Sequence, residues 1–510
     1  MAERSKNMAE TPEQFDLIVV GGGPGGSTLA SFVAMRGHKV LLLEKHKFPR
    51  YSIGESLLPG TIHGICRMLG VREKIESANF MRKYGGTWRW GREQALWSFF
   101  FSENEQLHLE KFDYAYQVER SKFDEILLRH AAEIGVDVRE EHSVIGVIKD
   151  GDRIAGVRYT DENGCERVAR ARFVADASGH QSKLFALAGQ RLYSKFFRNV
   201  ALFCYYEGAK RRPEPRQGDI LCAAFDAGWF WFIPLSPTLT SVGAVIAPEC
   251  TALLQEDHET AMAGFVARCP IIADLLEPAT RVTSGDYGRF RVRSDYSYCN
   301  TRFFAPGLAL IGDAACFIDP VFSSGVHLAT YSALLAARSV NSCLDDSTLD
   351  EERCFEEFEY RYRIEFQTFY EFLLVTYDMN HDKESYFWNA RKIINTDETD
   401  NEAFVRLVSG MGTAGTEFFE KRAGIGECVE ISLNRHFYSE PPSREMDQEF
   451  IAQARARCAD LENIRRKRSS AANENPSMIL GVPYSPIPVR SRGLVVSEDG
   501  LSWREPNGRF

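Results

Sequence analysis

The chain has 510 residues, enough for two or three domains and for a large buried ligand site. With 44% hydrophobic and 26% charged residues, its composition is that of a globular protein and excludes a largely disordered or fibrous chain. Acidic residues outnumber basic ones, 71 to 61, and the net charge of −10 argues against non-specific nucleic-acid binding.

The cysteines and the N-terminal segment indicate a compartment. Twelve cysteines are scattered without metal-ligand or redox spacing, a pattern typical of free thiols in a reducing cytoplasm. The histidines also lack ligand spacing, so no metal site is predicted. The first fourteen residues have no apolar core, and no run reaches the roughly 18 apolar residues of a membrane span. We therefore expect a cytoplasmic protein without a membrane span.

Residues 15–44 have the pattern of a dinucleotide-binding unit. An apolar strand, residues 15–20, runs into the glycine-rich sequence Gly-Gly-Gly-Pro-Gly-Gly. Gly21 permits the tight turn, Gly23 allows a pyrophosphate to approach the backbone, and Gly26 lets the next helix pack against the strand. A helix from Ser27 to Arg36 and a second apolar strand follow.

Glu44 ends this second strand, about twenty residues beyond the glycines. An acid at this place hydrogen-bonds the hydroxyl groups of an adenosine ribose. Because strand, glycines, helix, second strand and acid occur in order, the segment predicts dinucleotide binding far more strongly than a glycine motif alone.

The next part of the chain alternates loops, helices and strands. A polar loop, residues 45–56, leads to helices up to about residue 78 and to a pair of strands at 83–91 and 97–101. A helix from Arg120 to about Ile134 precedes strands that we expect to form a meander beside the nucleotide domain. Residues 172–179 form an apolar strand whose carboxyl end should return to the cofactor.

The pattern then changes to aromatic, alternating strands between about residues 196 and 289, typical of a separate antiparallel sheet. A buried strand at 307–313 and a small-residue helix at 325–340 return to the nucleotide domain. The chain beyond is strongly helical at 351–379 and mixed helical to about 468. It ends in a loop or linker at 469–486 and a short hairpin or disordered tail.

A second signal favours FAD over NAD. The strand at 307–313 ends in Gly312-Asp313, which places a carboxylate near the ribityl and pyrophosphate region of an extended flavin. Arg120 and Glu44 supply further polar anchors along the same ligand. No second G-x-G-x-x-G occurs for a nicotinamide cofactor, so we expect the flavin to be reduced by another protein.

The chain resembles the flavin-dependent halogenases over about residues 15–345, and within them the branch that acts on phenols and pyrroles in polyketide and peptide biosynthesis. The resemblance rests on the glycine sequence, on Phe48-Pro49-Arg50 followed by Gly54-Glu55-Ser56, on Lys83 before Gly-Gly-Thr-Trp, on Trp229-Phe230-Trp231-Phe232-Ile233-Pro234, and on Gly312-Asp313. The W-x-W-x-I-P sequence is the most specific of these, because flavin monooxygenases share the glycine and Gly-Asp motifs.

The resemblance implies a mixed α/β (α+β) fold with three parts. A Rossmann-like FAD-binding domain of the glutathione reductase and aromatic hydroxylase type would comprise residues 15–185 and 286–345. An antiparallel substrate sheet would occupy 186–285, and a mostly helical region 346–510. The cofactor would be held by Gly21, Gly23, Gly26, Glu44, Arg50, Arg120 and Asp313.

Lys83 matches the family's catalytic lysine. Reduced flavin and O2 convert chloride to hypochlorous acid, and a lysine can hold this acid by a hydrogen bond or as a chloramine and deliver the halogen to one ring carbon. Considered without the resemblance, a lysine at a strand edge is nearly always a solvated charge.

Trp229 and Trp231 lie two residues apart, so on a strand their side chains point to the same face. Core packing is the plain interpretation of such a pair. In the family they form a wall that screens the substrate from the flavin and suppresses direct hydroxylation, and a packed wall can serve both purposes.

Ser324 and Gly325 take the place where the family offers backbone groups to the halide. A plain helix cap is the alternative interpretation, and both can hold because a helix N-terminus favours an anion. Tryptophan halogenases carry a glutamate where this chain has Phe322. Free tryptophan is therefore disfavoured, and a phenol activated by its own oxygen is favoured.

We therefore expect a two-component, FAD-dependent halogenase of secondary metabolism that chlorinates a tyrosine-like phenol. Its partners would be a separate flavin reductase and an acyl or peptidyl carrier protein bearing the substrate. The carrier would dock on aromatic residues of the helix at 351–379 or on basic residues at 465–468. The rival functions are an aromatic hydroxylase, a flavin-dependent reductase of isoprenoid double bonds and a non-enzymatic flavin-binding protein.

Overall fold

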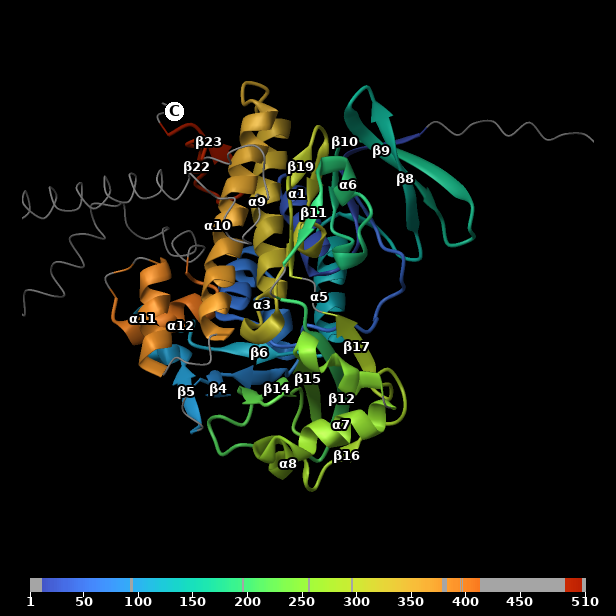
Figure 1. Cartoon of the computed structure of the whole chain (residues 1–510). Helices are drawn as coiled ribbons and strands as arrows, with labels where there is room; N and C mark the ends of the chain where they lie inside the picture. The colour runs from blue at the N-terminus through green and yellow to red at the C-terminus, as the bar shows by residue number, and fades with distance from the viewer. Residues whose placement is uncertain are drawn as a thin grey trace, which may run out of the picture.

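The structure is a computed structural model in which two large sheets are flanked by long helices (Figure 1). It describes residues 12–91, 95–194, 197–255, 257–294, 297–377, 383–394, 396, 398–412 and 491–506. Figure 1 shows the first sheet in the upper half of the molecule and the second sheet below it. The mixed α/β fold predicted from the sequence is confirmed.

The first sheet has a parallel centre. Its strand order is β19-β20-β10-β1-β2-β7, with β9 beside β10 and β8 beside β9. The pairs β1–β10, β1–β2, β2–β7 and β10–β20 are parallel. The strands are β1 (Glu13–Val20), β2 (Val40–Leu43), β7 (Asp137–Arg139), β8 (Ser143–Asp150), β9 (Arg153–Thr160), β10 (Glu166–Asp176), β19 (Phe304–Ala305) and β20 (Leu308–Leu310).

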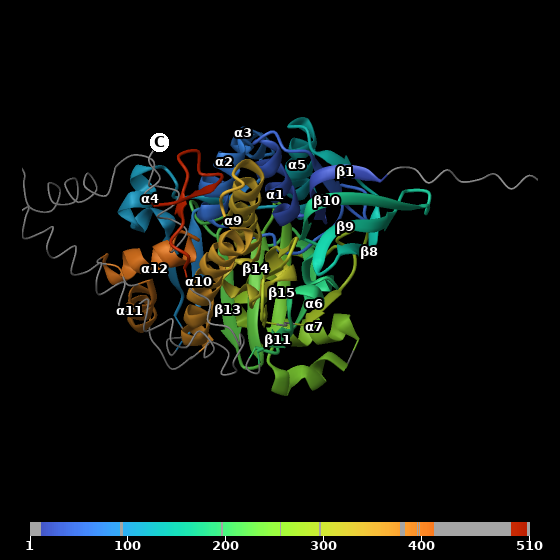
Figure 2. The same ribbon diagram turned by 90° about the horizontal axis from the view of Figure 1, so that it is seen from above.

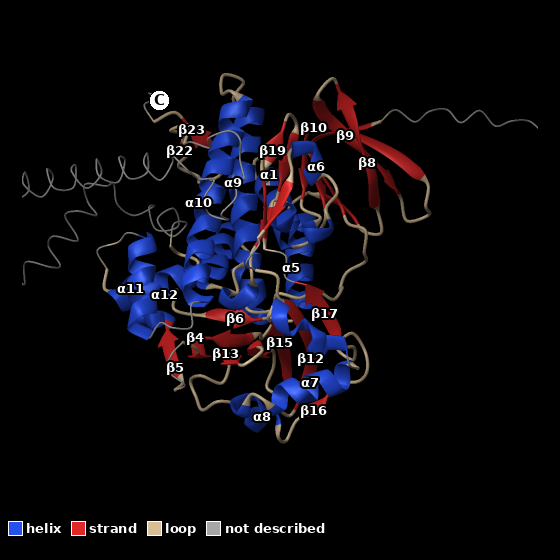
Figure 3. Cartoon of the chain, in the orientation of Figure 1, coloured by secondary structure: helices blue, strands red, loops and turns tan. Residues whose placement is uncertain are grey.

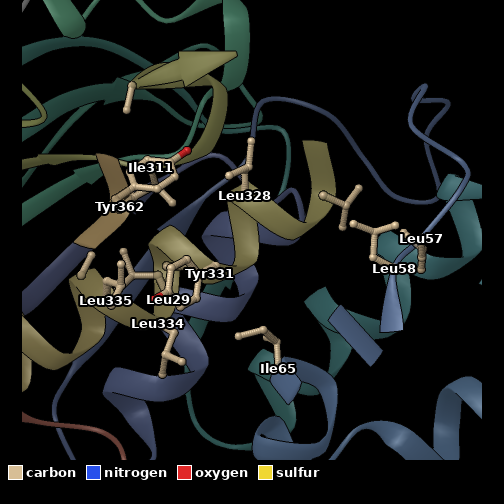
Figure 4. Packing of buried hydrophobic residues seen from close by; sticks show 14 of the residues in the cluster. Leu29, Leu57, Leu58, Ile65, Ile311, Leu328, Tyr331, Leu334, Leu335 and Tyr362 are labelled. Atoms are coloured by element: carbon tan, nitrogen blue, oxygen red, sulfur yellow. The ribbon is translucent and has the colours of Figure 1, made fainter. Parts of the chain in front are cut away.

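Three helices, α1 (Pro24–Ala34), α5 (Arg120–Glu133) and α9 (Gly325–Asp345), pack in this part of the molecule. Helix α1 begins at Pro24, three residues before the predicted start, because proline suits the first turn of a helix. Figure 4 shows Leu29 of α1 beside Tyr331 and Leu334 of α9, and all three side chains are fully or almost fully buried. This apolar contact fixes α9 against the glycine-rich turn.

The second sheet is mainly antiparallel, as its alternating pattern predicted. Its order is β16-β12-β15-β14-β13-β4-β5, with β17 also on β12, and only β13–β4 pairs in parallel. The strands are β4 (Gly85–Arg89), β5 (Trp97–Phe100), β12 (Val200–Glu207), β13 (Ile220–Phe225), β14 (Gly228–Pro234), β15 (Leu239–Ile246), β16 (Thr280–Arg281) and β17 (Arg291–Ser294).

The two faces of this sheet belong to different cores. Phe230 and Phe232 face a core that includes Met262 of α7 (His258–Ala267) and Ile272 of α8 (Pro270–Leu276). Alternate residues of β14 face the larger core toward the first sheet. Strands β4 and β5 join this sheet although they lie within 15–185, and the predicted domain boundaries stay a prediction.

The described C-terminal helices gather on one side of the molecule (Figure 3). They are α10 (Glu351–Tyr377), α11 (Lys383–Ile394) and α12 (Asp400–Val408), and α10 runs beside α9 in both Figure 1 and Figure 2. Of the two predicted alternatives for the end of the chain, a short hairpin or a disordered tail, the described residues form a hairpin of β22 (Val495–Val496) and β23 (Trp503–Arg504). No helix in the described ranges is long and apolar enough to cross a bilayer.

The remaining α-helices and strands, and one π-helical turn, are short. They are the π-helical turn Gly60–Cys66, the helices α2 (Arg67–Leu69), α3 (Arg72–Ser77), α4 (Glu105–Leu109) and α6 (Phe185–Ala188), and the strands β3 (Met81–Lys83), β6 (Ala115–Gln117), β11 (Arg191–Tyr193), β18 (Tyr298–Asn300) and β21 (Cys316–Phe317). Strand β3 pairs with β6, and this pairing holds Lys83 opposite Ala115.

Candidate active site

A cavity of about 970 Å³ extends between the two sheets. Its walls include Gly21 and Glu44, which follow β1 and β2, and also Trp229, Trp231 and Val245 of the second sheet. Cavities of this size hold cofactors and bury most of their surface. The predicted dinucleotide end and the predicted screening wall therefore face one common space.

The glycine-rich turn leaves room for a ligand through backbone geometry. Gly21 has a φ of +103°, and a Cβ there would lie 2.6 Å from the carbonyl oxygen of Ala177. A Cβ on Gly26 would lie 1.9 Å from the oxygen of Gly21, so a side chain would push α1 away from the turn. Gly23 lines the cavity at the N-terminus of α1, whose free N–H groups favour an anion.

Glu44 lines the cavity, and its carboxylate also holds the turn. Its Oε2 accepts a hydrogen bond from the N–H of Gly22 at 2.7 Å, and its Oε1 accepts one from the N–H of His46 at 2.9 Å. A carboxylate oxygen accepts more than one hydrogen bond, so ribose hydroxyls can share these oxygens.

The predicted anchors Arg50 and Arg120 meet on one buried carboxylate, that of Asp124. Arg120 binds it through two nitrogens at 2.7 and 2.9 Å, and Arg50 binds it at 3.0 Å. The second terminal nitrogen of Arg50 lies 3.4 Å from where a Cβ of Gly23 would be. The Arg50 guanidinium therefore lies beside the glycine-rich turn, where its positive charge would suit a pyrophosphate.

Asp313 lines the same cavity in the turn after β20. Burial raises the pKa of its carboxyl group to about 6, although Arg120, Arg293 and Arg191 act in the opposite direction. An extended dinucleotide such as FAD fits this arrangement of the glycine-rich turn, the N-terminus of α1, the two arginines and Asp313. Within the described residues, no cluster of three or more His, Cys, Asp or Glu side chains could hold a metal ion.

Trp229 and Trp231 point into the cavity from the same face of β14, as their spacing predicted. Their ring centroids lie 6.2 Å apart. The Trp231 ring lies over Gly243 of β15, where an added Cβ would come within 2.2 Å of it. The indole N–H of Trp231 donates to Ser241 Oγ at 3.2 Å, and that of Trp229 donates to the hydroxyl of Tyr377 at 2.8 Å.

Lys83 is buried and does not line the cavity itself. Its ammonium group donates to Ser56 Oγ at 3.0 Å and to the carbonyl oxygen of Leu57 at 3.1 Å. Ser56 does line the cavity, so Lys83 lies directly behind the cavity wall. Burial lowers the pKa of Lys83 to about 8, although Asp219 acts to raise it.

Ser324 and Gly325 lie at the N-terminus of α9. Gly325 lines the cavity, and Ser324 is fully buried. In the part of the chain that the structure describes, Ser324 Oγ has no hydrogen-bond partner. The preceding Phe322 stacks on Trp88 at 5.4 Å and on Phe372 at 4.9 Å, so an aromatic stack fills this position.

Sequence reasoning missed several buried acids of the site. Asp124 holds both arginines, and Glu55 lies in the cavity wall, where Tyr205 donates to it at 2.8 Å. Burial raises the pKa of Glu55 to about 7. Asp319 lies behind the wall, before Ser324, and is fully buried. Glu55 belongs to the Gly-Glu-Ser motif, but nothing in the sequence marks Asp124 or Asp319.

Comparisons with known proteins agree with this geometry. The family described as tryptophan halogenase matches residues 16–112 and 102–428. A tryptophan 2-halogenase of Chondromyces crocatus is 33% identical over 91% of this chain and 88% of its own. A pyrrole-2-carbonyl peptidyl-carrier-protein chlorinase of Pseudomonas fluorescens is 30% identical over 72% of this chain and 84% of its own.

Solved structures of flavin-dependent halogenases are also similar to this chain. The structure of the myxobacterial chondrochloren halogenase has a TM-score of 0.73 and 52% identity, covering 97% of this chain and 100% of that one. A flavin-dependent brominase structure has a TM-score of 0.67 and 27% identity, covering 78% of this chain and 94% of that one.

Replacing Glu44 by alanine should weaken FAD binding by about 1–3 kcal/mol, the range for losing charge-assisted hydrogen bonds. The dissociation constant, measured by flavin fluorescence titration, should rise roughly 5- to 150-fold. Glu166→Ala, which alters an exposed acid of β10 in the same sheet, is the matched control. Equal affinity in both variants would show that Glu44 does not hold the cofactor.

Proposed function

The chain belongs to the tryptophan halogenase family and is a flavin-dependent halogenase that uses FAD, O2 and halide; from this premise we propose that it chlorinates a phenol held by a carrier protein. The observation that carries the chlorination is a buried lysine with a lowered pKa behind a cavity wall that also bears two tryptophans. A separate reductase supplies the reduced flavin, as in the family.

Bound FAD, in its reduced form and with O2, supplies the oxidation of chloride to hypochlorous acid, which consumes one proton and releases water. The glycine-rich turn and Glu44 hold the cofactor, together with Arg50, Arg120 and Asp313. Ser324 and Gly325 bind the halide. The unpartnered Ser324 hydroxyl and the N-terminus of a 21-residue helix support this assignment, because both attract an anion.

Lys83 delivers the halogen at the cavity wall formed by Ser56, to whose hydroxyl its side chain is hydrogen-bonded. The lowered pKa of its side chain leaves a substantial neutral fraction near pH 8, and a neutral amine can attack hypochlorous acid. The amine nitrogen gains chlorine and water leaves; the aromatic ring then takes the chlorine, and the amine regains the ring's proton. Trp229 and Trp231 keep the ring away from the flavin, which suppresses hydroxylation.

Phe322 supports the proposed substrate class. The tryptophan halogenases carry a glutamate at this position, whereas here Phe322 fills it in a stack with Trp88 and Phe372. A phenol activates its own ring and needs no such partner. The aromatic residues of α10 do not form a carrier docking face, because most are buried. The alternative basic segment, 465–468, lies outside the described residues.

The function is tested by product analysis. Protein with FAD, a flavin reductase, NADH and O2 should give products with the chlorine or bromine isotope pattern from phenols when chloride or bromide is present. Without the reductase, the protein should not consume NADH. Hydroxylated product without halide would support the hydroxylase, and anaerobic reduction of an isoprenoid double bond would support the reductase.

Replacing Lys83 by methionine should leave FAD binding intact but reduce halogenated product roughly 100-fold or more.

The stability of Lys83→Met at pH 7 should change little, because losing two hydrogen bonds, about 1 kcal/mol each, is offset by removal of a buried charge. The buried charge lowers the stability of the wild-type fold by its full amount below pH 8, which is about the pKa of Lys83 in the folded protein. This destabilisation disappears as the pH rises to 10.5, the pKa in the unfolded chain. Lys74→Met alters a partly exposed lysine and should keep activity. Full activity in Lys83→Met would assign delivery to another group.

Carrier-tethered substrate should be turned over in preference to free substrate, since one relative of this chain is a chlorinase of a pyrrole held by a peptidyl carrier protein. The assay compares a tyrosine-like phenol and pyrrole-2-carboxylate, each free and as a thioester on a carrier protein, with free tryptophan. Equal or faster turnover of a free compound would contradict the tethered-substrate proposal.

A further inference from the structure

A largely buried hydrogen-bonded cluster includes one tryptophan of the cavity wall and extends behind it. We call Asn199, Trp229, Asp319 and Tyr377 the Asp319 cluster. They come from the chain before β12, from β14, from the segment before α9 and from the last residue of α10. The cluster therefore joins the second sheet and the segment before α9 to the C-terminal helices.

One side of the cluster fixes Trp229. Its indole N–H donates to the Tyr377 hydroxyl at 2.8 Å, and that hydroxyl donates to Asp319 Oδ2 at 2.7 Å. Asn199 donates to the same two oxygens, at 3.0 Å to Tyr377 and at 3.2 Å to Asp319. Since an indole has one polar atom, this bond sets the rotation of the Trp229 ring in the cavity wall.

The other side of the cluster fixes the turn that leads to Ser324. Asp319 Oδ1 accepts the N–H of Val321 at 3.1 Å, and the N–H of Asp319 donates to Ser297 Oγ at 3.0 Å. The next residues turn through Ser323, whose φ is +60°, into the N-terminus of α9. One carboxylate thus holds the turn with one oxygen and, through Tyr377, the wall with the other.

Helix α10 contacts this turn at a second point. Phe372 stacks on Phe322. Trp90, the residue after β4, donates its indole N–H to the carbonyl oxygen of Thr376 at 2.6 Å. The end of α10 is therefore hydrogen-bonded to Trp229 of the wall, to Asp319 before the turn and to Trp90 after β4. Its position relative to the cavity is set by directional contacts as well as by apolar packing.

We propose that Asp319 and Tyr377 are positioning residues that hold the Trp229 wall and the Ser324 turn in a fixed relation, so that the end of α10 governs both halide affinity and the retention of hypohalous acid. This inference rests on the proposed function of Trp229 and Ser324. It gives the C-terminal helices a role in the active site.

Tyr377→Phe removes only the hydroxyl and is the test. It leaves the Trp229 N–H without its acceptor and Asp319 without one donor, so both wall and turn can shift. In the FAD-loaded protein, the chloride KM should rise about fivefold or more, and halogenated product per flavin oxidised should fall at least twofold, with unchanged FAD affinity. The rise in Tm on adding chloride, relative to equal sodium acetate, should shrink as well.

Tyr370→Phe is the matched control, because it removes a buried hydroxyl from the same helix outside the cluster, one that lies 3.3 Å from Ser194 Oγ. It should keep the wild-type chloride KM and product yield. Trp229→Phe combined with Tyr377→Phe should lower the product yield no further than the worse single variant, because both remove the same hydrogen bond.

Equal effects in Tyr377→Phe and Tyr370→Phe would overturn the proposal, as would a changed chloride KM without a changed product yield, or the reverse. Additive losses in the double variant would overturn the link through Trp229. Failure of the wild-type protein to halogenate any substrate would instead refute the proposed function, so the two failures are distinguishable.

Discussion

The parallel alignment of β1, β2, β10 and β20 is the constraint on which the rest of the site depends. Val20 lies opposite both Leu43 and Asp176, and Asp176 lies opposite Leu310, so the four strands end at one edge of the sheet. Every following turn opens toward the same cavity. Changing the register of one strand would move its terminal residue away from the ligand, because a strand advances about 3.3 Å per residue.

Buried carboxylates complete this edge by binding groups from distant segments. Asp124 joins two arginines that are 70 residues apart in the chain, and Asp319 joins a tryptophan wall to the turn before α9. Each carboxylate oxygen has a hydrogen-bond donor, which offsets the cost of burying the charge. Such directional contacts give the site a single arrangement that apolar packing alone would not specify.

The two faces of the second sheet have different roles: one lines the cavity and the other packs in a separate core. On β14, Trp229 and Trp231 face the cavity, while Phe230 and Phe232 lie in the core beneath α7 and α8. Gly243 permits the Trp231 ring to lie flat on β15. The same strand therefore anchors the sheet in its own core and presents a rigid aromatic wall to the ligand.

The sequence by itself determined the features that depend on local pattern. The strand, glycine and helix order predicted the dinucleotide end, alternation predicted the shared face of Trp229 and Trp231, and the motifs marked Lys83 and Ser324. Only the tertiary structure decided that Lys83 lies behind Ser56 instead of in the cavity, that Asp124 and Asp319 are structural centres of the site, and that α10 reaches it. A single acid carries no periodic or motif signal, and its partners are set by contacts between segments that only folding brings together.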